Sequence, residues 1–342
     1  MQTAFDILVA QDPVNMALYG FMGSGILFHG HRLGLYRELA AAPDGVALDT
    51  LAQRLDLDQD TLRRVLGGAM AWNLVGHGAY GYVLTSGAQR SLDPASPQFL
   101  GPLLEHFADN TQPLFEHLDA ALASGQAQWS KLAQEAQAPF DYLEAEERGS
   151  AFHDAMWSLS HQPSEELVGL GLLDEVDSIV DLGGGVGAFA IAAARRHPGL
   201  RATVFDLPAV ERHCLARVES MELLGRVDFE AGDFWDSPLP KAQAYALGFI
   251  LSDWDDEQSC ALLRRVREAL PENGRVLVLD RLLEASGAAP FNAVMQDLAM
   301  LLETGGRHRT AEQFEALLRA AGFSRTQVTR GSGEKHAVIG FV

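Results

Sequence analysis

The sequence predicts an α/β protein in which a mostly parallel sheet follows an N-terminal, mostly helical domain. From residue 178 onward, apolar strand-like runs alternate with segments of helical periodicity. Such alternation is typical of a parallel sheet covered by helices on both faces. The first strand-like run ends in a glycine-rich turn at 183–187, as at the start of a βαβ unit. Residues 48–85 read as two short helices and a hairpin, a winged-helix pattern.

Length and composition are those of an ordinary globular protein. The 342 residues are 47% hydrophobic, which permits one large or two moderate domains. A net charge of −20 repels phosphate backbones, so we expect neither nucleic acid nor an anionic membrane as a partner. Two cysteines, Cys214 and Cys260, are too few for a disulfide framework and suit a reducing cytosol. No basic segment precedes an apolar one near residue 1, and we expect a cytoplasmic protein.

The first 41 residues predict a helix over 14–41 that is broken near Gly23 and Gly25. Its apolar part, 16–28, is too short and too glycine-rich to span a bilayer. It is also too hydrophobic for a free terminus, so we expect a partner subunit to cover it.

The winged-helix pattern comprises predicted helices at 48–55 and 57–66 and a hairpin over 74–85. Asp49 is a candidate cap of the first helix, and Asp58 or Asp60 of the second. A DNA-reading domain and a dimerisation module both fit this order. The region is mildly acidic and its second helix continues into small and apolar residues, which favours dimerisation.

Residues 91–177 predict a mostly helical region. Breaks are expected at Pro94, Pro97, Pro113 and Pro139. One helix carries an apolar stripe of Phe152, Met156 and Leu159, with His153, Trp157 and Ser160 on an adjoining face. Such a stripe fits a core helix and a pocket-lining helix equally well.

The remaining chain, 178–342, predicts the sheet and its helices. Strands are expected at 178–182, 202–206, 226–230, 243–250, 274–280, 325–330 and 335–342, and helices at 187–196, 209–222, 257–270 and 311–321. Ligands of such sheets bind at the carboxyl ends of the strands. Asp181, Asp206, Asp233 and Ser252 all fall at such ends.

The glycine turn fits two cofactor classes. Gly183-x-Gly185-x-x-Ala188 satisfies a dinucleotide fingerprint, whereas Asp181-x-Gly183-x-Gly185-x-Gly187 is the loop of S-adenosylmethionine (SAM) methyltransferases. An acid after the next strand, Asp206, could hold ribose hydroxyls of either cofactor. The pair Asp233-Phe234 after the third strand suits an adenine amine and ring face, which favours SAM.

Five motifs occur in order along the chain. They are Asp181–Gly187, Phe205–Pro208, Gly232–Phe234, Leu251–Glu257 and Gly305–Thr310. With the winged-helix start, the chain resembles the small-molecule O-methyltransferases of the plant caffeate and flavonoid type. The resemblance extends to bacterial natural-product methyltransferases, including anthracycline and phenazine types. It implies a class I methyltransferase Rossmann-like sheet, SAM as cofactor, a small aromatic acceptor and a homodimer built through the N-terminal domain.

The resemblance also implies roles for individual residues and domains. The cofactor-binding residues would be Asp181, Gly183, Gly185, Gly187, Asp206, Leu207, Asp233, Phe234 and Ser160. The substrate-binding residues would be Phe152, His153, Met156, Trp157 and Asp253, and no residue is assigned to a metal. The domains would be a winged-helix-like dimerisation domain at 1–90, a helical linking region at 91–177 and a SAM-binding catalytic domain at 178–342.

The catalytic positions depart from the plant pattern. Ser252 stands where that pattern has a histidine base, and Gly248 stands where a basic residue is common. The flanking acids fall at Asp280, which is still acidic, and at His308. A serine hydroxyl cannot accept a proton at neutral pH without its own base. His308 is then either a displaced base or a structural histidine, and His153 and His161 are alternative bases.

We therefore expect SAM-dependent methyl transfer to a hydroxyl of a small aromatic or heteroaromatic metabolite, in natural-product biosynthesis. The sulfonium of SAM is already activated, so aligning the acceptor can supply much of the acceleration. The predicted catalytic residues are Ser252, His308 and Asp280. Alternatives are N-methylation, non-methylating chemistry such as hydroxylation or rearrangement on the same scaffold, and a SAM-sensing regulator.

Overall fold

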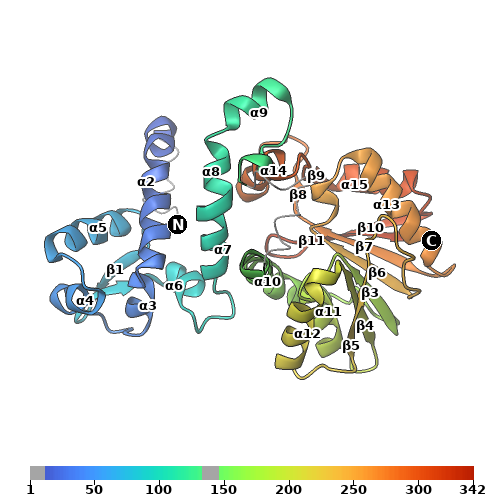
Figure 1. The fold of residues 1–342 in the computed structure, drawn as a ribbon, viewed down its shortest axis with the longest axis horizontal. Coiled ribbons are helices and arrows are strands. Elements are labelled where there is room, and N and C mark those ends of the chain that lie inside the picture. The colour runs from blue at the N-terminus through green and yellow to red at the C-terminus, as the bar shows by residue number, and fades with distance from the viewer. Residues whose placement is uncertain (1–11, 133–145) are drawn as a thin grey trace. The chain divides into compact units, whose positions relative to one another are not determined.

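The structure of the chain is a computed structural model that describes residues 12–132 and 146–342. Contacts divide the chain into two compact units, 1–108 and 109–342, and each is described by itself (Figure 1). The predicted fold class is confirmed, because the second unit contains a mostly parallel sheet and the first is mostly helical. The predicted three-part division of the chain stays a prediction.

The first unit contains the expected two short helices and hairpin. Its elements are α2 (Pro13–Arg32), α3 (Leu35–Ala40), α4 (Leu48–Leu55), α5 (Gln59–Ala71), β1 (Val75–Gly78), β2 (Gly81–Leu84), α6 (Ser86–Leu92) and α7 (Gly101–His106). Asp58 caps α5, because its carboxylate accepts the Thr61 N–H at 2.8 Å. Asp49 lies inside the first turn of α4 and is not its N-cap.

The expected break near Gly23 and Gly25 is wrong, because α2 is continuous through both residues. A Cβ on Gly23 would lie 2.5 Å from a ring carbon of Trp72. Gly23 therefore permits a close contact with the residue that ends α5, and glycine within a helix is tolerated for such packing. No helix among the described residues is both long and apolar enough to cross a bilayer.

Helices precede the sheet in the second unit. A π-helical turn at Phe107–Thr111 leads into α8 (Gln112–Phe115), followed by α9 (Leu118–Ser124), a 3₁₀ turn at Trp129–Lys131 and α10 (Glu146–Val168). The break expected at Pro113 is wrong, since this proline lies in the first turn of α8, where its missing N–H costs no helical hydrogen bond. Pro139 lies outside the described residues.

The sheet has seven strands in the order β10-β11-β7-β6-β3-β4-β5. Their bounds are β3 (Ser178–Leu182), β4 (Arg201–Asp206), β5 (Val227–Ala231), β6 (Ala244–Gly248), β7 (Arg275–Asp280), β10 (Arg325–Thr329) and β11 (His336–Phe341). β5, β4, β3, β6 and β7 are parallel, whereas β11 runs antiparallel to β7 and β10 antiparallel to β11. The carboxyl ends of the five parallel strands therefore share one edge, as the alternation predicted.

Helices cover both faces of the sheet (Figure 1). α10, α11 (Ala188–Arg196) and α12 (Glu211–Ser220) pack on one face, and α13 (Asp256–Ala269) and α15 (Ala311–Ala320) on the other. Each face buries an apolar core, and such burial is the main force that holds the layers together.

Three features of this unit differ from the expected elements. β6 ends at Gly248 rather than at 250, because Phe249 adopts a left-handed φ of 57° that ends the strand. Residues Leu251–Asp253 then form a 3₁₀ turn. A helix α14 (Phe291–Glu303) and a two-strand pair, β8 (Leu282–Leu283) with β9 (Arg309–Thr310), were not expected.

Candidate active site

The glycine turn between β3 and α11 has the backbone conformation that requires glycine. Gly183, Gly185 and Gly187 have φ values of 66°, 55° and 80°. A Cβ on Gly183 would lie 2.4 Å from the side chain of Ile250, whereas a Cβ on Gly185 would meet nothing within 4 Å. Gly183 is thus needed for packing, and Gly185 leaves open space through which a ligand can approach the backbone.

Two buried carboxylates hold this turn. Asp181 accepts the Ala190 N–H at 3.0 Å, in the first turn of α11, and Asp206 accepts the Gly185 N–H at 2.7 Å. Burial raises the pKa of Asp181 to about 6, and burial also raises the pKa of Asp206. Asp206 also accepts the N–H of Leu207 at 2.7 Å. The structure therefore brings the two predicted acids to the same loop.

Asp233 and Phe234 follow β5 and lie near the loop. The Asp233 carboxylate accepts the Trp235 N–H at 2.8 Å. A ring carbon of Phe234 lies 3.7 Å from the position of a Cβ on Gly183, so this ring borders the glycine turn. The ends of β3, β4 and β5 therefore lie around one loop, and their role as a cofactor site stays a prediction.

The predicted pocket residues of α10 have varied surroundings. His153 is buried, and its ring centroid lies 5.2 Å from that of His213. Burial, and to a lesser degree the charge of His213, lowers the pKa of His153 to about 4. Trp157 stacks on His161 at 4.1 Å and lies under the guanidinium of Arg217 at 4.5 Å. His153 and Trp157 therefore contact α12, and both are neutral groups at pH 7.

Phe152, Met156 and Ser160 of α10 are partly buried. Their roles toward acceptor and cofactor stay predictions.

A histidine–aspartate pair lies at the carboxyl end of β7. Nδ1 of His308 lies 2.9 Å from Oδ1 of Asp280, and each side chain is 1% exposed. The parallel pairing of β8 with β9 joins Leu282 to Arg309 and so brings these two distant residues together. The His308 N–H donates to Asp297 at 2.7 Å, which fixes the backbone.

One atom of each member of this pair is unsatisfied. Nε2 of His308 and Oδ2 of Asp280 are buried and have no hydrogen-bond partner among the residues that the structure describes. A purely structural buried histidine normally uses both ring nitrogens. An Nδ1–H that donates to Asp280 leaves the Nε2 lone pair available, which is the arrangement of an oriented base.

The loop that carries His308 packs directly on the Ser252 segment. A Cβ on Gly306 would lie 2.0 Å from the carbonyl oxygen of Ser252. Buried Arg309 donates to the carbonyl oxygens of Leu251 at 2.6 Å and Trp254 at 2.8 Å. The structure therefore places Ser252, which is 1% exposed, beside the loop of the His308–Asp280 pair.

Two further acids accompany the pair. Burial, then Asp280 and Glu303, raise the pKa of Asp253 well above its ordinary value. Burial raises the pKa of Glu303 to about 7, although its carboxylate accepts the Thr111 hydroxyl at 2.6 Å. Glu303 thus takes up a proton near neutral pH.

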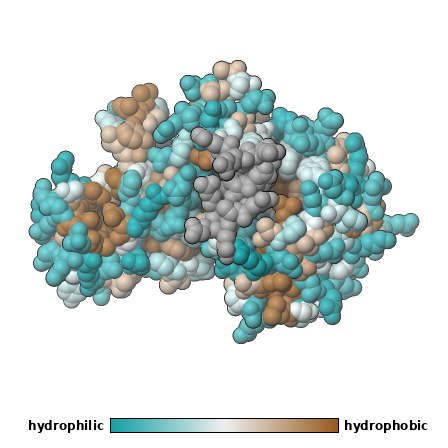
Figure 2. Space-filling model, in the orientation of Figure 1, coloured by the Kyte–Doolittle hydropathy of each residue, from teal (hydrophilic) through white to brown (hydrophobic). Residues whose placement is uncertain are grey.

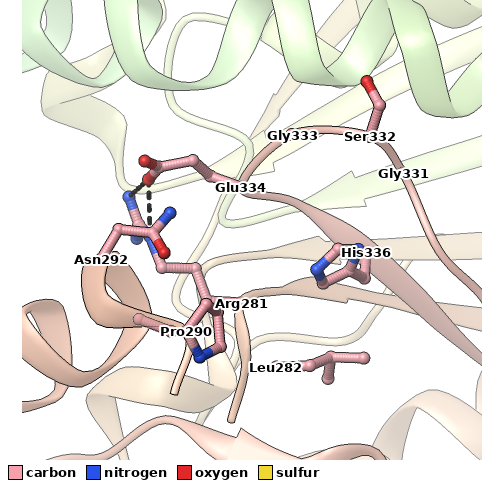
Figure 3. A pocket seen from close by; sticks show the side chains of 10 residues that line it. Arg281, Leu282, Pro290, Asn292, Gly331, Ser332, Gly333, Glu334 and His336 are labelled. Atoms are coloured by element: carbon pink, nitrogen blue, oxygen red, sulfur yellow. Dashed lines mark hydrogen bonds and ion pairs between the residues drawn. The ribbon is translucent and has the colours of Figure 1, made fainter. Parts of the chain in front are cut away.

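A cavity of about 400 Å³ lies beside this site (Figure 3). It is lined by the end of β7, the start of α14 and the loop before β11. Arg281 and Glu334 form an ion pair in its wall, with nitrogen–oxygen distances of 3.0 and 2.9 Å. None of the predicted site residues lines this cavity.

Comparison with known proteins decides the family. Residues 115–324 match the sequence model of a family described as O-methyltransferase domain. The chain belongs to this family. Acetylserotonin O-methyltransferase of Mus musculus is 34% identical over 337 residues, which cover 94% of this chain and 86% of the relative.

A bacterial O-methyltransferase and a solved human structure are also similar. 3-Hydroxy-5-methyl-1-naphthoate 3-O-methyltransferase of Streptomyces sahachiroi is 31% identical over 298 residues, covering 87% of this chain and 85% of that protein. The crystal structure of human N-acetylserotonin methyltransferase in complex with SAM superposes with a TM-score of 0.89 and 26% identity, covering 97% of both chains.

Three buried or partly buried residues near the candidate site were not among the site residues predicted from the sequence. Arg309 braces the Ser252 segment, Glu303 joins the acids, and Lys335 lies buried in front of β11. Strand parity gave no signal for Lys335, because residues of both parities are buried in β11.

Proposed function

We propose that this enzyme transfers a methyl group from SAM to a hydroxyl of a small aromatic or heteroaromatic metabolite, in natural-product biosynthesis. The names of the relatives support this substrate class, since they specify hydroxyl methylation of acetylserotonin and of a hydroxynaphthoate. The residues also fit SAM. Gly185 leaves open space at the loop. The Asp206 carboxylate, which accepts the Gly185 N–H, is proposed to accept the ribose hydroxyls of SAM.

The observation that carries the choice of hydroxyl over nitrogen is the unpartnered Nε2 of His308. SAM, when bound, supplies a methyl group on an activated sulfonium. A hydroxyl must lose its proton as its oxygen takes that methyl group, and Nε2 can receive the proton. Asp280 holds the imidazole by Nδ1 and stabilises the imidazolium that forms. Ser252 has no base of its own and orients the acceptor at most.

Alignment of the acceptor with the sulfonium supplies the larger part of the acceleration in this proposal. Well-oriented reacting groups gain about 7–11 kcal/mol, whereas a general base contributes about 10²–10⁴-fold. Asp253, which lies next to Ser252, is proposed to hydrogen-bond the acceptor.

N-methylation and non-methylating chemistry are the alternative functions. Incubation with a panel of phenols and N-heteroaromatics, followed by detection of S-adenosylhomocysteine, decides whether a methyl group is transferred. An NMR spectrum of the product distinguishes a methoxy from an N-methyl group. Conversion of an acceptor without S-adenosylhomocysteine would contradict the proposal and favour non-methylating chemistry.

Replacing Asp206 by alanine should weaken SAM binding about ten- to hundredfold, because charge-assisted hydrogen bonds contribute about 1.5–3 kcal/mol. Calorimetry with purified protein measures the affinity. Asp228→Ala, an exposed acid on the neighbouring strand β5, serves as the control and should bind SAM normally. Equal affinities of the two variants would refute the role assigned to Asp206.

The apolar surface of α2 supports a homodimer through the N-terminal domain. Val14, Leu18, Tyr19, Phe21 and Met22 are between 49% and 75% exposed. Figure 2 shows this hydrophobic patch at the place of α2 in Figure 1. Exposed patches of this kind mark protein–protein contacts, and we propose that a second copy of the chain covers this one.

Leu18→Glu combined with Phe21→Glu should therefore give a monomer in size-exclusion chromatography with light scattering, because two charges would be buried unpaired. Leu122→Glu, at an exposed leucine of α9, is the matched control and should leave the assembly unchanged. A dimer that survives the double substitution would exclude α2 as the interface.

A further inference from the structure

Lys335 is a buried cation that no carboxylate of the described residues contacts directly, although the charges of Asp181 and Asp280 act on it at longer range. Among the residues that the structure describes, the buried lysine and arginine side chains are Arg281, Arg309 and Lys335. Arg281 pairs with Glu334, and Arg309 is bonded to Asp256 and to backbone carbonyls. Among the described residues, no carboxylate oxygen lies within 4.0 Å of Nζ of Lys335, so Lys335 forms no ion pair with them. A buried, unpaired ammonium is costly, so its site is suited to an anion that arrives from outside.

The ammonium of Lys335 occupies the space that the missing side chain of Gly248 leaves. Lys335 directly precedes β11, yet its Nζ lies 3.5 Å from the position of a Cβ on Gly248, at the end of β6. Nζ also lies 4.2 Å from the ring centroid of Phe249. Phe249 holds its ring there with the left-handed φ of 57°, a conformation that is rare outside glycine and clusters at functional sites.

This position adjoins the glycine turn. Ile250, two residues after Gly248, packs against Gly183. Burial lowers the pKa of Lys335 to about 8, and the charge of Asp181 is the largest influence that opposes it. The ammonium therefore lies at the end of β6, within electrostatic reach of Asp181, the acid that directly precedes the glycine turn.

We propose that Lys335 binds the carboxylate of the methionine part of SAM. That part carries a sulfonium, an ammonium and a carboxylate. The acids at the strand ends suit the two cationic groups, and of the three buried cations only Lys335 has no anion already bonded to it. The inference rests on the SAM dependence of the proposed function and does not depend on the acceptor.

Calorimetry with SAM and with decarboxylated SAM tests this assignment in the absence of an acceptor. The wild type should bind SAM about ten- to hundredfold more tightly than decarboxylated SAM, because one charge-assisted contact is lost. Lys335→Met, which keeps an unbranched apolar side chain and removes the charge, should weaken SAM binding by the same factor and leave the binding of decarboxylated SAM unchanged. Lys241→Met, at an exposed lysine, should behave as wild type.

Two further measurements keep the test decisive if Lys335→Met is poorly folded by circular dichroism. The affinity of the wild type for SAM should fall as the pH rises above about 8, because Lys335 loses its proton there. Burial lowers the pKa of Lys335, the charges of Asp181 and Asp280 raise it, and the charge of Arg281 lowers it. The affinity for decarboxylated SAM should not fall there. Lys335→Ala with Gly248→Lys should restore SAM binding relative to Lys335→Ala, since the relocated amine reaches the same space.

The assignment would be overturned if the wild type and Lys335→Met showed the same preference for SAM over decarboxylated SAM. It would also be overturned if the affinities of the wild type for the two ligands changed with pH in the same way. Failure of the wild type to bind either ligand would instead contradict the SAM dependence on which the proposed function rests.

Discussion

Replacing His308 by alanine should lower kcat about 10²–10⁴-fold, which is the usual contribution of a general base. The reason is the geometry of the pair, in which Asp280 lies 2.9 Å from Nδ1 and Nε2 has no partner among the described residues. The measurement is steady-state kinetics with an acceptor from the panel of phenols. Affinity for SAM should stay within about threefold of wild type, because no cofactor role is assigned to His308.

Matched variants separate proton transfer from loss of structure. Asp280→Asn should also lower kcat, because an amide no longer fixes the imidazole tautomer. Ser252→Ala should lower kcat no more than about tenfold, since one hydrogen bond is worth about 0.5–1.5 kcal/mol net. An inactive Ser252→Ala enzyme that binds SAM and acceptor normally would show that the serine belongs to a proton relay. A His308→Ala enzyme with nearly full kcat would leave positioning alone as the source of catalysis.

Replacing Gly306 by alanine should both destabilise the protein and lower its activity. The added methyl group would lie 2.0 Å from the carbonyl oxygen of Ser252, so the backbone of one segment must move. Overpacking of this kind typically costs about 1–3 kcal/mol in the free energy of unfolding. The displaced loop carries His308, and misplacement by about 1 Å can cost about 10²-fold in kcat.

Denaturant unfolding and steady-state kinetics measure the two effects of Gly306→Ala. Gly199→Ala is the control, because a Cβ there would meet nothing within 4 Å and its φ lies outside the left-handed region. The control should keep both stability and kcat near the wild-type values. Wild-type kinetics in Gly306→Ala would mean that the tight packing of the two segments is not needed to place His308.

The local parts of the cofactor site could be predicted from the sequence because their signals are local. The glycine turn requires residues that adopt a positive φ, and Gly183, Gly185 and Gly187 do so. Alternating apolar runs predicted the strands, and parallel strands bring the acids at their ends to one edge. Asp181 and Asp206 therefore meet at the loop even though 24 residues separate their positions in the sequence.

The sequence was misleading where glycine and apolar residues have more than one use. Gly23 predicted a break in α2, yet it serves a contact with Trp72 that depends on how α2 packs against α5. Helix α14 was missed even though its polar residues Asn292, Gln296 and Glu303 recur at helical spacing.

From its sequence alone, this chain is determined to be an α/β protein with an O-methyltransferase motif set and a serine in place of the usual base. Only the tertiary structure decided which buried groups lie close to the positions where the motifs depart from the plant pattern. His308 reaches Asp280 because β8 pairs with β9, and Lys335 reaches the space at Gly248 from a strand at the far side of β7. Contacts between residues this distant in the chain depend on strand order and packing, which no local pattern of residues encodes.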